Sequence, residues 1–74
     1  MQTQITMDRT GDTRHQFDTA TSQGVADAEK RFMELTGKGF RAAKLSADGE
    51  PAQIMKSFDK TAEKVVFFPS LQGG

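Results

Sequence analysis

The stretch that decides the fold is Lys64-Val65-Val66-Phe67-Phe68. This run of β-branched and aromatic residues is too short for a helix and too apolar for a sheet edge, so it predicts a central, well-buried strand. Pro69 follows and should end the strand, because proline cannot donate to a sheet ladder. Side chains along a strand alternate between its two faces, and one of the two adjacent Phe residues must therefore point away from the core.

The clearest element in the sequence is an amphipathic helix that comes before this strand. Its apolar residues recur at helical spacing and are separated by charged ones, which gives one apolar stripe and one charged face. The stripe consists of Val25, Ala28, Phe32 and Leu35.

Both ends of this helix have candidate capping residues. The side chains that can accept from its first N–H groups are those of Asp18, Thr19, Thr21 and Ser22. The pattern leaves open which of them is the cap. At the other end, either Gly37 or Gly39 can adopt the left-handed conformation that ends a helix.

Two segments before the helix form a predicted hairpin. Residues 2–8 alternate in polarity, with Ile5 and Met7 on one face and Gln4 and Thr6 on the other, as in a half-buried strand. Residues 13–17 offer a second short strand, and the Gly and Asp residues between the two segments favour a reversal of the chain.

Two segments after the helix form a second predicted hairpin. Residues 40–45 and 52–58 flank a turn at 46–50, where Asp48-Gly49 is a strong short-range hairpin signal. Pro51 fits only at the beginning of the second of these strands.

The order of elements is strand, strand, helix, strand, strand, strand, which predicts an α+β fold. One amphipathic helix must bury its stripe, and a mixed sheet with an apolar face is the simple solution for a chain of 74 residues. If the last strand lies beside the first, the two run parallel in the middle of the sheet. This is the β-grasp arrangement.

Composition excludes several classes of function. The formal net charge is zero, which argues against nucleic acid as a partner, and the absence of cysteine excludes a disulfide framework and a thiolate nucleophile. No segment has the apolar length of a membrane span or the pattern of a signal peptide, so we expect neither insertion nor export and a cytoplasmic location. We also expect the chain to be a monomer. The single histidine, His15, is best interpreted as a strand residue, without a metal or catalytic role.

The element order and the C-terminal residues together resemble the ubiquitin-like (β-grasp) superfamily. The last dozen residues are similar to its sulfur-carrier branch, which includes the molybdopterin synthase small subunit and thiamine-type carriers. This branch ends in an acidic residue, an apolar strand, a proline-containing segment and Gly-Gly, matched here by Glu63, residues 64–68, Pro69 and Gly73-Gly74. Ser70 departs from the pattern, since a second proline is common there. The chain also looks similar to bacterial ubiquitin-like modifiers.

The resemblance implies a domain at 1–69 and a flexible tail at 70–74 that carries the chemistry. Gly74, preceded by Gly73, would be activated by an E1-like adenylating enzyme that uses ATP, while the carrier binds no cofactor and is not itself an enzyme. Glycines suit passage through a narrow channel because they lack Cβ atoms. Further partners would be an E2-like protein and a JAB-type peptidase, or a sulfur-acceptor synthase. Phe68, Leu71 and Gln72 are candidate partner-binding residues. Leu71 and Gln72 would help a partner to hold the tail, or they would form a linker without specific contacts.

The alternative is a non-covalent binding module of β-grasp type with an inert tail. In this interpretation an exposed Phe of the last strand, near Ala43 or Met55 on the open face of the sheet, would form a partner-binding patch.

Overall fold

The computed structural model describes residues 1–45 and 52–69. The described elements are β1 (Gln2–Asp8), β2 (Gly11–Phe17), α1 (Ser22–Gly37), β3 (Phe40–Leu45), β4 (Gln53–Met55) and β5 (Lys64–Pro69). They follow one another as strand, strand, helix, strand, strand, strand. The predicted turn at 46–50, Pro51 and the predicted tail at 70–74 lie outside the described residues.

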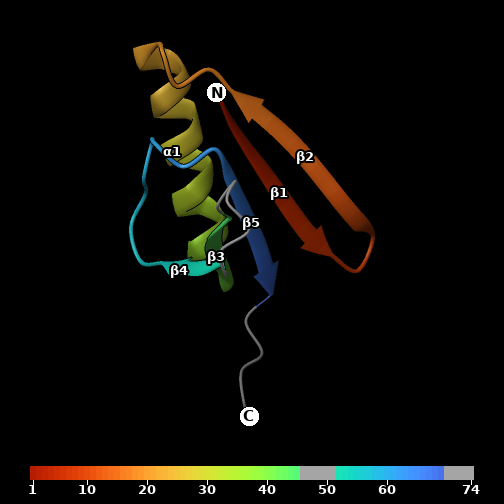
Figure 1. Cartoon of the computed structure of the whole chain (residues 1–74). Coiled ribbons are helices and arrows are strands. Elements are labelled where there is room, and N and C mark those ends of the chain that lie inside the picture. Colours follow the sequence, from red (N-terminus) through yellow and green to blue (C-terminus); the bar gives the residue numbers. More distant parts are fainter. Residues whose placement is uncertain (46–51, 70–74) are drawn as a thin grey trace.

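The strands form one mixed sheet in the order β2-β1-β5-β3-β4, with α1 on one of its faces (Figure 1). β5 is central, as predicted, and runs parallel to β1 and antiparallel to β3. The remaining pairs, β1 with β2 and β3 with β4, are antiparallel. The fold is therefore α+β, with a five-stranded mixed sheet and one helix in the described ranges.

Some strand bounds differ from the predicted ones. β2 begins at Gly11, two residues earlier than predicted, because Gly11 has a φ of 116° and pairs directly with Asp8. β4 is limited to Gln53–Met55 within the predicted 52–58. Phe58 lies beyond it and packs edge-to-face against Phe32, with ring centroids 5.9 Å apart. β4 is shorter than the predicted strand because the chain after Met55 turns back toward the helix.

Thr21 caps the start of α1, which answers the choice that the sequence left open. Its hydroxyl accepts a hydrogen bond from the Gly24 N–H at 3.0 Å. At the other end, the Lys38 N–H donates to the Glu34 and Leu35 carbonyls at 3.2 and 3.1 Å. Gly39, with a φ of 98°, takes the left-handed conformation, whereas Gly37 lies within the helix.

The core forms where the apolar stripe of α1 meets the central strands. Ala28, Phe32 and Leu35 are buried as predicted, and Val25 is half-buried. Phe67 has no exposed surface and packs edge-to-face on Phe32, with ring centroids 5.8 Å apart.

Met55 lies on the helix side of the sheet, not on the open face as expected. It is opposite Ala42, which is opposite Phe67, and opposed residues share a face. Met55 consequently packs against the core. The expectation that Met55 flanks an exposed Phe was wrong because Met55 is opposite Ala42, and it is Ile54 that is opposite Ala43 on the open face.

Candidate functional site on the outer face of the sheet

The face of β1 that is buried is the polar one. Gln2 and Gln4 have no exposed surface and Thr6 is 5% exposed, whereas Met7 is 43% exposed. The alternation predicted for residues 2–8 is present, but it is oriented opposite to the usual rule that apolar residues face the core.

Hydrogen bonds explain how this polar face is tolerated. Gln4 Nε2 donates to the Ala28 carbonyl of α1 and to Gln2 Oε1, each at 3.0 Å. Gln2 Nε2 donates to the carbonyls of Asp59 and Ala62 at 2.9 and 3.0 Å. A buried amide costs little when its donors are satisfied in this way. The glutamines thus join the first strand to the helix and to the segment before β5.

The same layer includes Arg31 of α1. Its Nη2 lies 3.4 Å from Thr6 Oγ1, at the long limit for a hydrogen bond. Arg31 Nε and Gln4 Oε1 are buried and have no hydrogen-bond partner among the described residues. The interface between helix and sheet is therefore polar beside β1 and apolar beside β5 and β3.

Because the polar face of β1 is buried, its apolar face joins the side of the sheet turned away from α1, which we call the outer face. One row of opposed residues crosses it through all five strands: Arg14, Ile5, Val66, Ala43 and Ile54. Met7 is two residues from Ile5 and Phe68 is two residues from Val66, so both point to the outer face and extend the apolar area. Ile54 is 53% exposed, and Ile5, Val66 and Phe68 are half-buried.

Cationic side chains share the outer face with this apolar area. Arg14 of β2 is opposite Ile5, Arg41 of β3 is opposite Phe68, and Lys64 of β5 is opposite Leu45. Among the described strands, Asp12 is the one acidic residue on this face. A surface with an apolar centre and mostly positive neighbours complements a partner with an apolar centre and carboxylates around it.

The predicted site residues have different outcomes. Phe68 is the Phe of β5 that points away from α1, opposite Arg41, and Ala43 is on the same face. Leu71, Gln72, Gly73 and Gly74 lie outside the described residues, so their role stays a prediction. Ile5, Val66 and Ile54 also belong to this candidate site, although the sequence did not single them out. Their period-2 pattern was visible, but the pattern does not say which face the helix covers.

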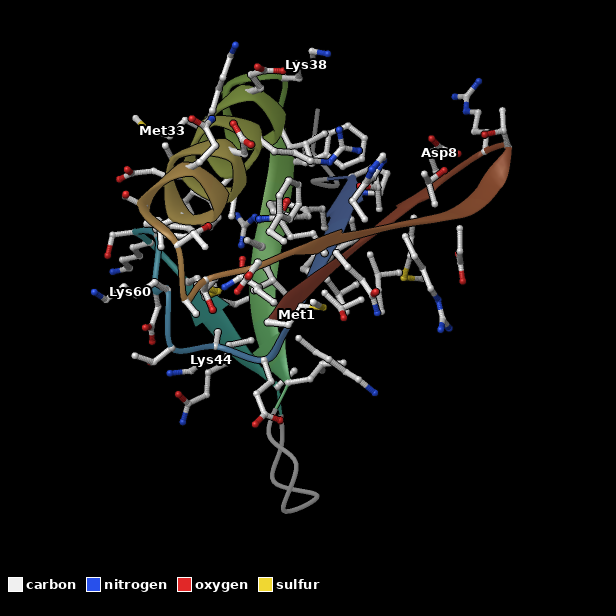
Figure 2. The ribbon with its side chains drawn as sticks, turned by 90° about the horizontal axis from the view of Figure 1, so that it is seen from above. Met1, Asp8, Met33, Lys38, Lys44 and Lys60 are labelled. Carbon is white, nitrogen blue, oxygen red and sulfur yellow. The ribbon has the colours of Figure 1, made fainter. Side chains whose placement is uncertain are left out.

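A second polar feature lies at the side of the sheet, where Lys44 Nζ and Asp59 Oδ2 are 3.4 Å apart. Asp59 Oδ1 also accepts from the Thr61 hydroxyl at 2.6 Å and from the Thr61 N–H at 2.9 Å. The hydrogen bonds from Thr61, with a smaller effect of Lys44, lower the pKa of Asp59 below its ordinary value. Figure 2 shows Lys44 and Lys60 on the opposite side of the molecule from Asp8 at the hairpin end.

Within residues 1–45 and 52–69, no three His, Asp or Glu side chains are grouped closely enough to hold a metal ion. In the same ranges, no helix has the length and apolarity to cross a membrane. Comparison of the chain with protein-family models, curated proteins and solved structures finds no match.

Proposed function

We propose that the chain is a ubiquitin-like protein modifier or sulfur carrier that a partner recognises through the outer face and activates at Gly74. The strand order β2-β1-β5-β3-β4, with β1 and β5 parallel, supports a β-grasp assignment. The observation that carries the proposal is the reversed polarity of β1, which buries glutamines beneath α1 and leaves Ile5 and Met7 on the outer face. Partly exposed apolar side chains that are grouped on one face are typical of a protein-binding surface.

The position of Phe68 connects this surface with the proposed chemistry. Phe68 lies on the outer face, and Gly74 follows it by six residues. Six residues span at most about 20 Å when extended. An adenylating enzyme bound to the outer face therefore needs its nucleotide site within that distance of β5. The proposal requires that Gly74 end the chain with a free carboxylate.

The proposed reaction takes place in the partner's site. The Gly74 carboxylate attacks the α-phosphorus of ATP, forms an acyl-adenylate and releases pyrophosphate. Sulfide can then displace AMP to leave a thiocarboxylate, or an amine of a target can displace it to leave an amide. In this proposal the described residues bind the partner and take no other part in these steps.

The test is intact mass after incubation with ATP and a candidate E1-like enzyme, with sulfide or a target protein added separately. A gain equal to the mass difference between sulfur and oxygen identifies a carrier, and addition to a target amine identifies a modifier. A variant that lacks Gly73 and Gly74 should fold normally and give neither product. Ser70→Ala, which keeps both glycines, is the matched control. A truncated chain that is still adenylated would contradict the proposal.

A second candidate function is a non-covalent binding module, which the outer face supports without the tail. Ile54→Glu places a charge in the apolar area at a position that is 53% exposed, and Met33→Glu makes the same kind of change at a 64% exposed site on α1. The module is favoured if Ile54→Glu abolishes complex formation, Met33→Glu does not, and removal of Gly73-Gly74 has no effect. Loss of activation on truncation favours the first function instead.

A further inference from the structure

β2 is a long, exposed edge of the sheet. It has seven residues, and those from Gly11 to Gln16 are all exposed. It pairs with β1 on one side, and Figure 1 shows no described element on the other. Its register with β1 is one-to-one without a bulge, and it contains neither proline nor lysine. Natural sheets commonly use those features to prevent pairing at an edge, so this edge is open to a further strand.

The hairpin geometry shows which backbone groups are available for pairing. Asp8 and Gly11 are opposed across a two-residue turn and so form a hydrogen-bonded pair. Hydrogen-bonded and non-hydrogen-bonded pairs alternate along an antiparallel ladder. Thr13, opposite Thr6, is therefore bonded toward β1, while Asp12 and Arg14 direct their N–H and C=O groups toward the open edge.

We propose that β2 pairs antiparallel with β2 of a second copy of this chain, about a two-fold axis at Thr13. In this register Thr13 is opposite Thr13 of the second copy, and Asp12 is opposite Arg14 of the second copy. The two-fold axis repeats that contact, so two Asp–Arg pairs form across the interface. Both residues have the backbone groups needed to bond each other, and neither has an ion-pair partner within the described residues.

The neighbouring symmetric registers are less favourable. An axis at Asp12 places two aspartates directly opposite each other, and an axis at Arg14 does the same with two arginines. Like charges in directly opposed positions destabilise a sheet, whereas opposite charges stabilise it. A two-fold axis that passes between two residues of β2 is excluded. It would place a residue whose N–H and C=O groups bond to β1 directly opposite a residue whose groups face the open edge. The charge order along β2 thus selects Thr13.

The pairing would extend the sheet without covering the outer face. A two-fold axis perpendicular to the sheet keeps both copies of α1 on one side and both outer faces on the other. The apolar residues of the two copies then lie on one continuous surface. The proposed dimer takes the place of the expected monomer, and its formation does not depend on activation at Gly74.

Cysteine cross-linking tests the register. The chain has no cysteine, so one introduced thiol can form only an intermolecular disulfide. The Cα atoms of the two Thr13 residues, as a non-hydrogen-bonded pair, would be about 4.5 Å apart, which a disulfide can bridge. The two His15 residues would be offset by four positions, or roughly 13 Å along the strands. We expect Thr13→Cys to form a covalent dimer rapidly under mild oxidation and His15→Cys to form little. Equal rates for both variants, or no dimer with Thr13→Cys, would overturn the register.

Charge exchange tests the contact. Sedimentation equilibrium of the full chain should show a reversible dimer. Arg14→Asp, which opposes aspartates at two places, should weaken the dimer by about tenfold or more. Asp12→Arg should act similarly, and the double exchange Asp12→Arg with Arg14→Asp should restore dimerisation. Lys30→Asp, a matched charge change on the exposed side of α1, should have no effect. A wild-type chain that stays monomeric at millimolar concentration, or a double exchange that does not recover, would refute the proposal.

Discussion

Gln2 and Asp59 are 57 residues apart in the chain, yet Gln2 Nε2 donates to the Asp59 carbonyl oxygen at 2.9 Å. The same amide donates to Ala62 O at 3.0 Å, and the Ala62 N–H donates to Asp59 O at 3.2 Å. One buried side chain of β1 therefore holds both ends of a turn that leads into β5.

Gln2→Leu should destabilise the protein by about 2–4 kcal/mol, because it removes one donor from each of the Asp59 and Ala62 carbonyls and one of the two acceptors of Gln4 Nε2. Urea denaturation measures the free energy of unfolding. Gln53→Leu on β4, at an exposed position, is the matched control and should change it by less than about 0.5 kcal/mol. A similar small effect for both variants would show that the buried amide is not needed.

Alanine should have opposite effects at two glycines of α1. A Cβ at Gly24 would overlap the Asp18 carbonyl oxygen and lie 2.6 Å from its carbon, whereas a Cβ at Gly37 would meet nothing within 4 Å. Gly24→Ala should lower the free energy of unfolding by about 1–3 kcal/mol, since the backbone at Asp18 must shift. Gly37→Ala should raise the free energy of unfolding by about 0.4–1 kcal/mol, because alanine reduces the conformational freedom of the unfolded chain. Thermal unfolding of the two variants compares them directly, and stabilisation by Gly24→Ala would contradict the close approach.

The two adjacent Phe residues of β5 should separate stability from recognition. Phe67 is fully buried against Phe32, and Phe67→Ala should cost about 3–5 kcal/mol. Phe68 is half-buried on the outer face, and Phe68→Ala should cost only about 1–2 kcal/mol. Urea denaturation followed by circular dichroism gives both values. A partner-binding assay on Phe68→Ala, which should remain folded, then reports the contribution of the outer face. Equal destabilisation by both changes would mean that the two faces are equally buried.

Stability should decrease in acid partly through Asp59. Its folded pKa lies below the ordinary value of 3.8, chiefly because Thr61 donates hydrogen bonds to the carboxylate. A lowered folded pKa stabilises the fold when the pH is above the unfolded pKa, and that contribution is lost as the pH falls through the folded value. The difference in unfolding free energy between wild type and Asp59→Asn should thus be constant above about pH 5 and shrink below pH 3.8. A difference that grows on acidification would reverse the sign and contradict this assignment.

The sequence predicted the elements whose patterns are local. The stripe of α1 requires only helical spacing, and the apolar run of β5 requires only its own residues to indicate a central strand. Thr21 could not be distinguished from its three neighbours as the cap, because all four side chains can accept a hydrogen bond. Gly73 and Gly74 were proposed as functional from the sequence alone, and that proposal is still to be tested.

The sequence by itself determined the element order, the stripe of the helix and the alternation of each strand, because these depend on residue spacing within one segment. Only the tertiary structure decided which face of each strand meets the helix. For β1 the buried face is that of Gln2 and Gln4, since their amides reach carbonyls of α1 and of the segment before β5. Those acceptors are distant in sequence, so no local pattern could reveal that Ile5 and Met7 would be left on the outer face.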